Sequence, residues 1–271
     1  MTLCPIIAVV LLGATYLVAA DKNHGSSRAI RIVGHKHVSM ALLITFLVYS
    51  SVSSVLFQTF DCEVLDDGND YLRADYSIEC DTFRHRAFMI YAGFMILVYP
   101  VGIPALYAVF LFRNRKVLTD ENARQSDYGA YWISDLWMPY KPWLFYYEVV
   151  ECVRRITLAG VVLFFVGDNT STQISVTLLL AILFALIAGG LTPYDSQLDG
   201  WISCMGHAVV ILSLFFLLVT DVQVLDEAVI SQDAYGWILI ALNASMVLVV
   251  IRFACCGYGY AKDRTARGFP V

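Results

Sequence analysis

Charged residues are scarce in this sequence, and this scarcity decides its class. Asp, Glu, Lys and Arg make up 15% of the 271 residues, whereas apolar residues make up 59% and the mean hydropathy is +0.66. A soluble domain is surrounded by water alone and cannot leave so much apolar surface exposed, whereas a membrane protein can expose it to lipid. The composition therefore excludes an ordinary soluble protein and predicts one that lies in a membrane.

Seven apolar stretches each come close to the ~20 residues that a helix needs to cross a bilayer. They lie near residues 3–20, 37–58, 87–112, 147–167, 173–193, 201–220 and 236–254. The sequence therefore predicts an all-α polytopic membrane protein with seven transmembrane helices, which form a single transmembrane domain over residues 1–271.

The distribution of basic residues predicts the orientation. With the N-terminus outside, the segments on the cytoplasmic side and the helix ends beside them hold 15 of the 18 Lys and Arg residues. The outer loops keep Arg73, Arg84 and Arg86 and hold 13 of the 23 acids. Because Lys and Arg concentrate on the cytoplasmic side of membrane proteins, we expect the N-terminus outside and the C-terminus in the cytoplasm.

The first apolar stretch has no Lys or Arg before it, so the basic region that opens most signal peptides is missing. Val18-Ala19-Ala20 would offer small residues for cleavage before Asp21. Cleavage would place the basic segment 21–36 outside and invert every later loop. A first transmembrane helix is therefore the favoured interpretation, with a signal peptide as the alternative.

Further absences exclude several functions. None of the seven stretches contains the lysine that a retinal Schiff base would need. His207 is the one histidine in the interior of a stretch, since His37 is the first residue of the second stretch. The sequence shows no nucleotide-binding loop, catalytic triad or zinc-binding pattern. Its basic residues flank the membrane stretches and form no nucleic-acid-binding pattern. We therefore expect no enzyme activity, no cofactor, no metal site and no nucleic-acid partner.

The segment 59–86 holds Cys62 and Cys80 on the predicted outer side, where an oxidising environment favours a disulfide. Between them lies an acidic loop with a turn at Asp67-Gly68. No glutamate closes this loop at the position that an EF-hand needs, so we interpret the loop as solvated rather than calcium-binding.

Two modification sites are predicted outside this loop. Cys255 and Cys256 follow the last stretch on the cytoplasmic side and are candidates for palmitoylation. Asn169-Thr170-Ser171 is a candidate for glycosylation on the outer side, although it lies close to the membrane.

The third stretch contains Tyr99-Pro100-Val101-Gly102-Ile103-Pro104. Proline lacks a backbone N–H group and breaks the helical hydrogen-bond pattern, so we expect a kink here. Carbonyl groups freed inside a membrane need protein or water as partners. Pro100 and Pro104 therefore mark either a hinge or binding position or a purely structural kink.

The segment 113–146 is predicted to be a cytoplasmic loop that ends in an aromatic elbow at the membrane interface. The aromatic residues are Tyr128, Tyr131, Trp132, Trp137, Tyr140, Trp143, Phe145, Tyr146 and Tyr147, and Pro139 and Pro142 interrupt them. Aromatic rings of this kind concentrate at the level of the lipid headgroups.

The elbow leads into Glu148-Val-Val-Glu151-Cys-Val-Arg154-Arg155. On a helix, Glu151 lies three and four residues before the two arginines, which favours ion pairs. Ionisable residues at this depth often mark ion or substrate paths, so Glu148, Glu151, Arg154 and Arg155 are candidates for such a site. The alternative is a self-neutralised group that reaches the headgroups.

Three segments together resemble a known family: Trp143–Arg155, Tyr99–Pro104 and the Cys62–Cys80 loop. They are similar to the C-terminal membrane region of large protist and algal surface proteins, which often carry ephrin-receptor-like cysteine-rich repeats. The membrane part of those proteins is likened to the C-terminal domain of transient receptor potential (TRP)-like proteins. The resemblance covers roughly residues 37–260 and implies a membrane module with ion conduction; the repeats are absent from this chain.

A cation-channel or sensing subunit follows as the leading hypothesis, with cations and a homo-oligomer as possible partners beside the lipid bilayer. Its outer mouth would use the acids of segment 221–235, which are Asp221, Asp226, Glu227 and Asp233. This segment is short and lacks a filter-like run of glycine and aromatic residues. The alternatives are a seven-helix signalling receptor that binds a partner on 113–127, and a non-conducting anchor or lipid-interacting module. Each would lie in the plasma membrane or an endomembrane.

Overall fold

The computed structural model describes residues 3–22, 27–65, 68–121, 123, 132–161, 170–222, 236–245, 247–249 and 251–252. Five helical segments in this part of the chain are long and apolar enough to cross a membrane. They are Leu3–Asp21, Val33–Gln58, Phe83–Arg113, Thr170–Leu191 and Gln197–Asp221. The prediction of a mainly helical membrane protein is therefore confirmed. The number of seven spans and their orientation stay predictions.

The predicted stretches coincide with helices along the described chain. The first two are α1 (Leu3–Lys22) and α2 (Ser27–Gln58), and the third is divided into α3 (Phe83–Ile96), the π-helical turn η1 (Leu97–Val101) and α4 (Gly102–Arg113). The fifth and sixth are α10 (Thr170–Leu191) and α11 (Gln197–Asp221).

The fourth and seventh stretches are described in part. The fourth begins as α8 (Tyr147–Ile156) and continues as the π-helical turn η4 (Thr157–Val161), and residues 162–169 lie outside the described part. A shorter apolar helix over Gly236–Val249 coincides with the seventh. Neither is among the five long candidate spans.

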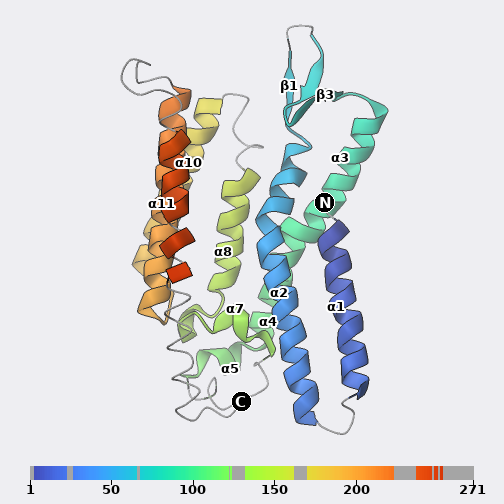
Figure 1. Cartoon of the computed structure of the whole chain (residues 1–271), viewed down its shortest axis with the longest axis vertical. Helices are drawn as coiled ribbons and strands as arrows, with labels where there is room; N and C mark the ends of the chain where they lie inside the picture. The colour runs from blue at the N-terminus through green and yellow to red at the C-terminus, as the bar shows by residue number, and fades with distance from the viewer. Residues whose placement is uncertain are drawn as a thin grey trace. The chain divides into compact units, whose positions relative to one another are not determined.

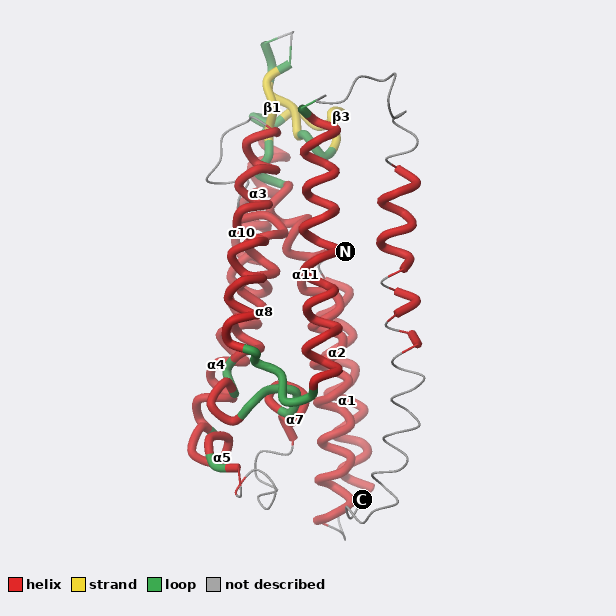
Figure 2. The backbone as a smooth tube through the Cα atoms, turned by 90° about the vertical axis from the view of Figure 1, so that its left-hand side faces the viewer, coloured by secondary structure: helices red, strands yellow, loops and turns green. Residues whose placement is uncertain are grey.

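The chain forms two compact units. The first comprises Met1–Asp168 together with Pro193–Asp195, and the second comprises Asn169–Thr192 and Ser196–Val271. In the first unit a small β-sheet lies at one end of α2 and α3, which is clear in Figures 1 and 2. Three short helices lie at the opposite end, namely α5 (Arg115–Thr119), α7 (Ser134–Trp137) and the 3₁₀ helix η3 (Pro142–Leu144). The segment 113–146 is therefore partly helical.

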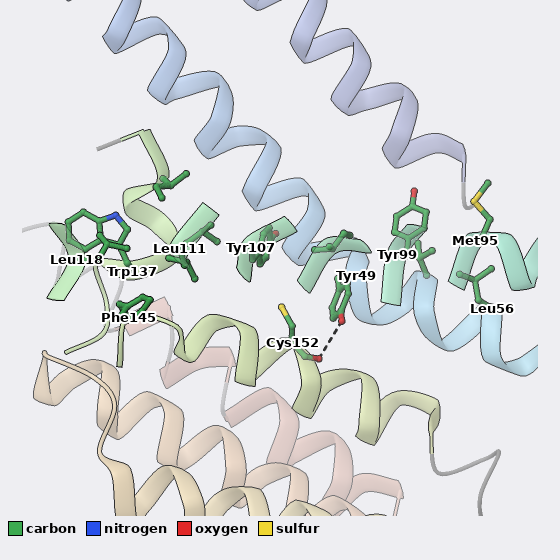
Figure 3. Packing of buried hydrophobic residues seen from close by; sticks show 14 of the residues in the cluster. Tyr49, Leu56, Met95, Tyr99, Tyr107, Leu111, Leu118, Trp137, Phe145 and Cys152 are labelled. Carbon is green, nitrogen blue, oxygen red and sulfur yellow. Dashed lines mark hydrogen bonds between the residues drawn. The ribbon is translucent and has the colours of Figure 1, made fainter. Parts of the chain in front are cut away.

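A continuous cluster of buried apolar side chains holds the first unit together. Figure 3 shows it running from Leu56 and Met95, past Tyr99 and Tyr107, to Leu118. Its members come from α2, from the α3–η1–α4 segment, from the short helices and from α8. Helices in lipid gain little from hydrophobic exclusion between them, so this close packing is what fixes their arrangement.

The segment predicted as a solvated loop forms an antiparallel sheet of three strands. Its strands are β1 (Cys62–Val64), β2 (Asp70–Leu72) and β3 (Asp75–Glu79), in the order β1-β2-β3. Gly68 has a φ of +81° at the first turn, a conformation that glycine adopts without steric cost, and its N–H donates to Leu65 O at 2.9 Å. The turn predicted at Asp67-Gly68 is thus present at Gly68.

Helix α2 and the turn η4 approach each other closely at Gly160. A Cβ atom at this position would lie 2.2 Å from Cδ2 of Phe57 and 2.9 Å from its Cβ. The backbone φ of 177° is accessible to any residue. The absence of a side chain, and not a special backbone conformation, is therefore what this contact requires.

In the second unit, α10 and α11 pack against each other. The Ser171 hydroxyl donates to the Asp221 carboxylate, which joins the start of α10 to the end of α11. Nearly all of their apolar side chains are exposed or half-buried in this chain, as expected for helices that face lipid.

Candidate functional site

The elbow before α8 is fixed by a short backbone strap, defined here as Pro193–Asp195. The Lys141 N–H donates to Pro193 O at 2.9 Å, and the Asp195 N–H donates to Pro139 O at 3.0 Å. These bonds make an isolated antiparallel bridge between Tyr140 and Tyr194. Segments more than fifty residues apart in sequence are therefore joined beside the first acid of α8.

Three tyrosine rings pack around this bridge. The ring centroid of Tyr140 lies 5.3 Å from that of Tyr147 and 5.3 Å from that of Tyr194. The centroids of Tyr147 and Tyr194 are 6.3 Å apart. Tilted arrangements at these distances are favourable for aromatic pairs. The predicted aromatic elbow is thus a packed structure in its described part, while Tyr128 and Tyr131 lie outside the described residues.

Glu148 is buried, and the Tyr140 hydroxyl donates to its Oε2 at 2.7 Å. Burial and the neighbouring Glu148 carboxylate raise the pKa of Tyr140 far above its usual value, so the phenol keeps its proton at neutral pH. The tyrosine is therefore a permanent donor to this acid.

Glu151 is also buried but binds the two arginines of its own helix. Arg154 Nε donates to Glu151 Oε2 at 2.9 Å, and Arg154 Nη2 donates to Oε1. Arg155 Nε donates to the same Oε1 at 3.3 Å. These contacts are the ones that the spacing in sequence indicates, because residues three and four apart meet on a helix.

The second arginine also contacts an aromatic ring. The guanidinium carbon of Arg155 lies 3.8 Å from the ring centroid of Phe46 in α2. A cation over an aromatic face is attracted by the negative charge density of the ring. The charged cluster thus has partners on both α8 and α2.

The proline segment is connected to α8 through Tyr49 of α2. The Tyr49 hydroxyl donates to Pro100 O at 3.3 Å and to Cys152 O at 3.5 Å, and the second contact is visible in Figure 3. The expected irregularity is η1, which contains Pro100. Pro104 lies in α4, two residues after its start, where α4 continues directly from η1.

The three-stranded sheet holds the predicted disulfide, since Cys62 and Cys80 are bonded. The Glu63 carboxylate accepts from the Tyr76 hydroxyl at 3.0 Å and from Arg73 Nε at 3.3 Å. These two hydrogen bonds hold the pKa of Glu63 below its usual value. Exposed groups of this kind contribute little energy singly but define the shape of the sheet.

The remaining predicted residues are not assembled into one site. Asp221 accepts from Ser171 and is the one predicted outer-mouth acid in the described part of the chain. Six predicted residues lie outside the described residues: Asn169, Asp226, Glu227, Asp233, Cys255 and Cys256.

The sequence pattern did not indicate that Tyr49, Tyr140 and Tyr194 are partners of the candidate residues. Tyr49 lies inside an apolar stretch, where nothing in the pattern separates it from a packing residue. The Tyr140–Tyr194 bridge joins distant segments, and a single sequence holds no signal for such a contact. The crowding of aromatic residues beside prolines was the available signal for the elbow.

The chain is similar to Cysteine repeat modular protein A of Toxoplasma gondii. The two share 26% identity over 174 residues, which covers 59% of this chain and 5% of the Toxoplasma protein. No family model matches the chain. No solved structure matches it either. The similarity supports the expected relation to cysteine-repeat proteins of protists, while the TRP-like relation stays a prediction.

Proposed function

We propose that this chain is a multi-pass membrane domain that anchors a surface protein of the cysteine-repeat type in the plasma membrane or an endomembrane. The domain would cross the bilayer seven times, with its N-terminus outside and its C-terminus in the cytoplasm. The lipid bilayer would be its main partner, and it would have neither enzyme activity nor a cofactor. The similarity to a much longer cysteine-repeat protein supports this role.

The observation that carries the proposal is that each of the two buried acids has a partner among the neighbouring side chains. Glu151 binds Arg154 and Arg155, and Glu148 accepts from Tyr140. An ion path would leave carboxylate oxygens available for the ion or for water. Glu151 is instead paired within α8, and the bond from Tyr140 to Glu148 joins the elbow to α8, as an anchor requires.

A second candidate function is cation conduction or sensing by a homo-oligomer of this chain. It is favoured by the Tyr49 hydroxyl, which bridges the carbonyls of Pro100 and Cys152. This bridge couples the irregular turn η1 to the helix that carries the charged cluster. Rotation of Tyr49 would release both carbonyls together, so Pro100, Pro104, Glu148, Glu151, Arg154 and Arg155 would act as gating elements.

Cation flux through the purified chain in liposomes separates the two functions. The comparison uses the wild type, Glu151→Gln and Glu63→Gln, each shown to be folded by gel filtration and circular dichroism. Glu63→Gln serves as the matched control because it removes an acid of the three-stranded sheet, far along the chain from α8. Flux is recorded across voltage and calcium concentration.

The anchor predicts no flux from any of the three proteins and predicts that Glu151→Gln affects stability alone. Flux that changes with Glu151→Gln but not with Glu63→Gln would overturn the anchor and place a cation path at the elbow. Flux that both variants preserve would establish conduction and remove the elbow from it. A receptor would differ from the anchor in binding a cytoplasmic partner on 113–127 in response to an agonist.

A further inference from the structure

We propose that Cys62, Cys80 and His85 form a zinc site when the disulfide between the two cysteines is reduced. Each residue offers one ligand atom, and these three atoms lie within 4.8 Å of one another. Thiolate sulfur and imidazole nitrogen are the ligands that Zn²⁺ prefers. The inference concerns the three-stranded sheet and does not depend on the proposed anchoring function.

The histidine is already arranged as a metal ligand. The Nε2 atom of His85 lies 3.0 Å from Thr59 O, and a carbonyl oxygen only accepts, so Nε2 carries the hydrogen. In the neutral ring Nδ1 then holds a free lone pair. This Nδ1 atom is buried and has no hydrogen-bond partner among the residues that the structure describes, and the whole residue is 3% exposed. Metal-bound histidines commonly donate their second N–H to a carbonyl group in this way.

Local structure places the three ligands together. Cys62 begins β1, Cys80 directly follows β3, and His85 lies in the first turn of α3. The N-cap residue Thr82 fixes that turn, because its hydroxyl accepts from the His85 N–H at 3.3 Å. The backbone therefore holds the three residues near one point.

The coordination needs only a local change. A Zn–S distance of about 2.3 Å in a tetrahedron places two sulfurs about 3.8 Å apart, so the reduced thiolates must separate from bonding distance. The Cα atoms of the two cysteines are 6.5 Å apart, which lets side-chain rotation supply this separation. Water or a small anion would complete the fourth position, since the site offers three protein ligands.

The chemistry balances with an external thiol reductant. A dithiol gives two electrons and two protons to the Cys62–Cys80 bond and closes its own disulfide, which leaves two protein thiols. Zn²⁺ then displaces the two thiol protons, and both sulfurs and His85 Nδ1 each supply an electron pair. The disulfide and the metal are thus alternative cross-links between Cys62 and Cys80 in the same sheet.

The test is zinc binding by the full chain in detergent micelles, before and after reduction with a phosphine. Reduction should raise the bound zinc by one equivalent per chain after desalting. Cobalt added in place of zinc should give thiolate-to-metal charge-transfer absorption with tetrahedral character. The double variant Cys62→Ser/Cys80→Ser keeps every other cysteine and is the matched control, which should show neither effect.

His85→Gln provides the decisive variant. The glutamine amide can still donate to Thr59 O, yet it offers no imidazole lone pair, so the reduced chain should stay folded and bind zinc weakly. The affinity should fall by more than the roughly 10–100-fold that loss of an outer-shell partner costs. No additional zinc on reduction of the wild type, or equal binding by His85→Gln, would overturn the proposal, as would equal binding by the double serine variant.

Discussion

A single hydroxyl group from the elbow donates to the carboxylate of Glu148. Tyr140 donates to this acid from the elbow, and the two residues are both buried. A buried carboxylate that loses a donor retains its cost of removal from water without the compensating bond. The hydrogen bond itself adds little to the stability of the folded chain. Its removal costs more, because the buried carboxylate is then left without this donor.

Tyr140→Phe is expected to lower the free energy of unfolding by about 1–3 kcal/mol, because it leaves Glu148 buried without this donor. Unfolding by denaturant in detergent micelles, followed by tryptophan fluorescence, measures the change. Tyr146→Phe is the control, since Tyr146 lies in the same elbow with an exposed side chain. Equal stability of the two variants would show that the hydroxyl of Tyr140 is dispensable.

Acid is expected to weaken the three-stranded sheet through Glu63. Its pKa in the folded chain is lowered from the usual 4.5 by the Tyr76 hydroxyl and by Arg73. A lowered pKa gives stability that is present above about pH 4.5 and is lost as the pH falls through the folded value. Limited proteolysis of the sheet between pH 5 and pH 3 measures this, and Glu63→Gln should flatten the dependence. Protection that rises on acidification would contradict the prediction.

Of the two acids of α8, the partners of Glu151 could be predicted from the sequence, whereas the partner of Glu148 could not. The contacts of Glu151 follow from helical spacing, because Arg154 and Arg155 lie three and four residues later. The partner of Glu148 lies eight residues earlier, across a segment broken by Pro142. No regular periodicity spans such a break, so that contact appears only in the folded chain.

At the scale of elements, the close approach of α2 and η4 depends on Gly160. Gly160→Ala is expected to destabilise the chain by about 1–3 kcal/mol, because the new methyl group overlaps the buried Phe57 ring. The same unfolding measurement applies. Gly93→Ala is the matched control, since a Cβ there meets nothing within 4 Å, and alanine favours a helix. A destabilisation by Gly93→Ala that equals that of Gly160→Ala would refute this steric explanation.

The helices could be predicted from sequence far better than the sheet. The backbone polar groups of a segment that spans a bilayer must bond within the segment, and a helix achieves this. Hydropathy alone therefore locates α1, α2, α10 and α11. In contrast, β1 and β2 have three residues each, too few for an alternating pattern to emerge. The disulfide was predictable because its two cysteines share one short loop.

At the scale of the whole molecule, the prediction concerns which side of the membrane each segment faces. An epitope inserted at Gly68 should bind antibody on intact cells, because the sheet is expected outside. The same epitope inserted after Thr119 should bind only after the membrane is permeabilised. The opposite pattern would invert the topology, and accessibility of both epitopes on intact cells would refute the orientation based on basic residues.

The bridge between Tyr140 and Tyr194 imposes a waiting time during synthesis. The ribosome must add 54 residues, including all of α10, after Tyr140 before its partner exists. At about 5–20 residues per second, this takes roughly 3–11 s. Throughout that interval the Pro139 and Lys141 backbone groups lack their partners in the strap. The elbow is therefore among the last parts of the first unit to close, and a chain stalled before Pro193 would carry it open.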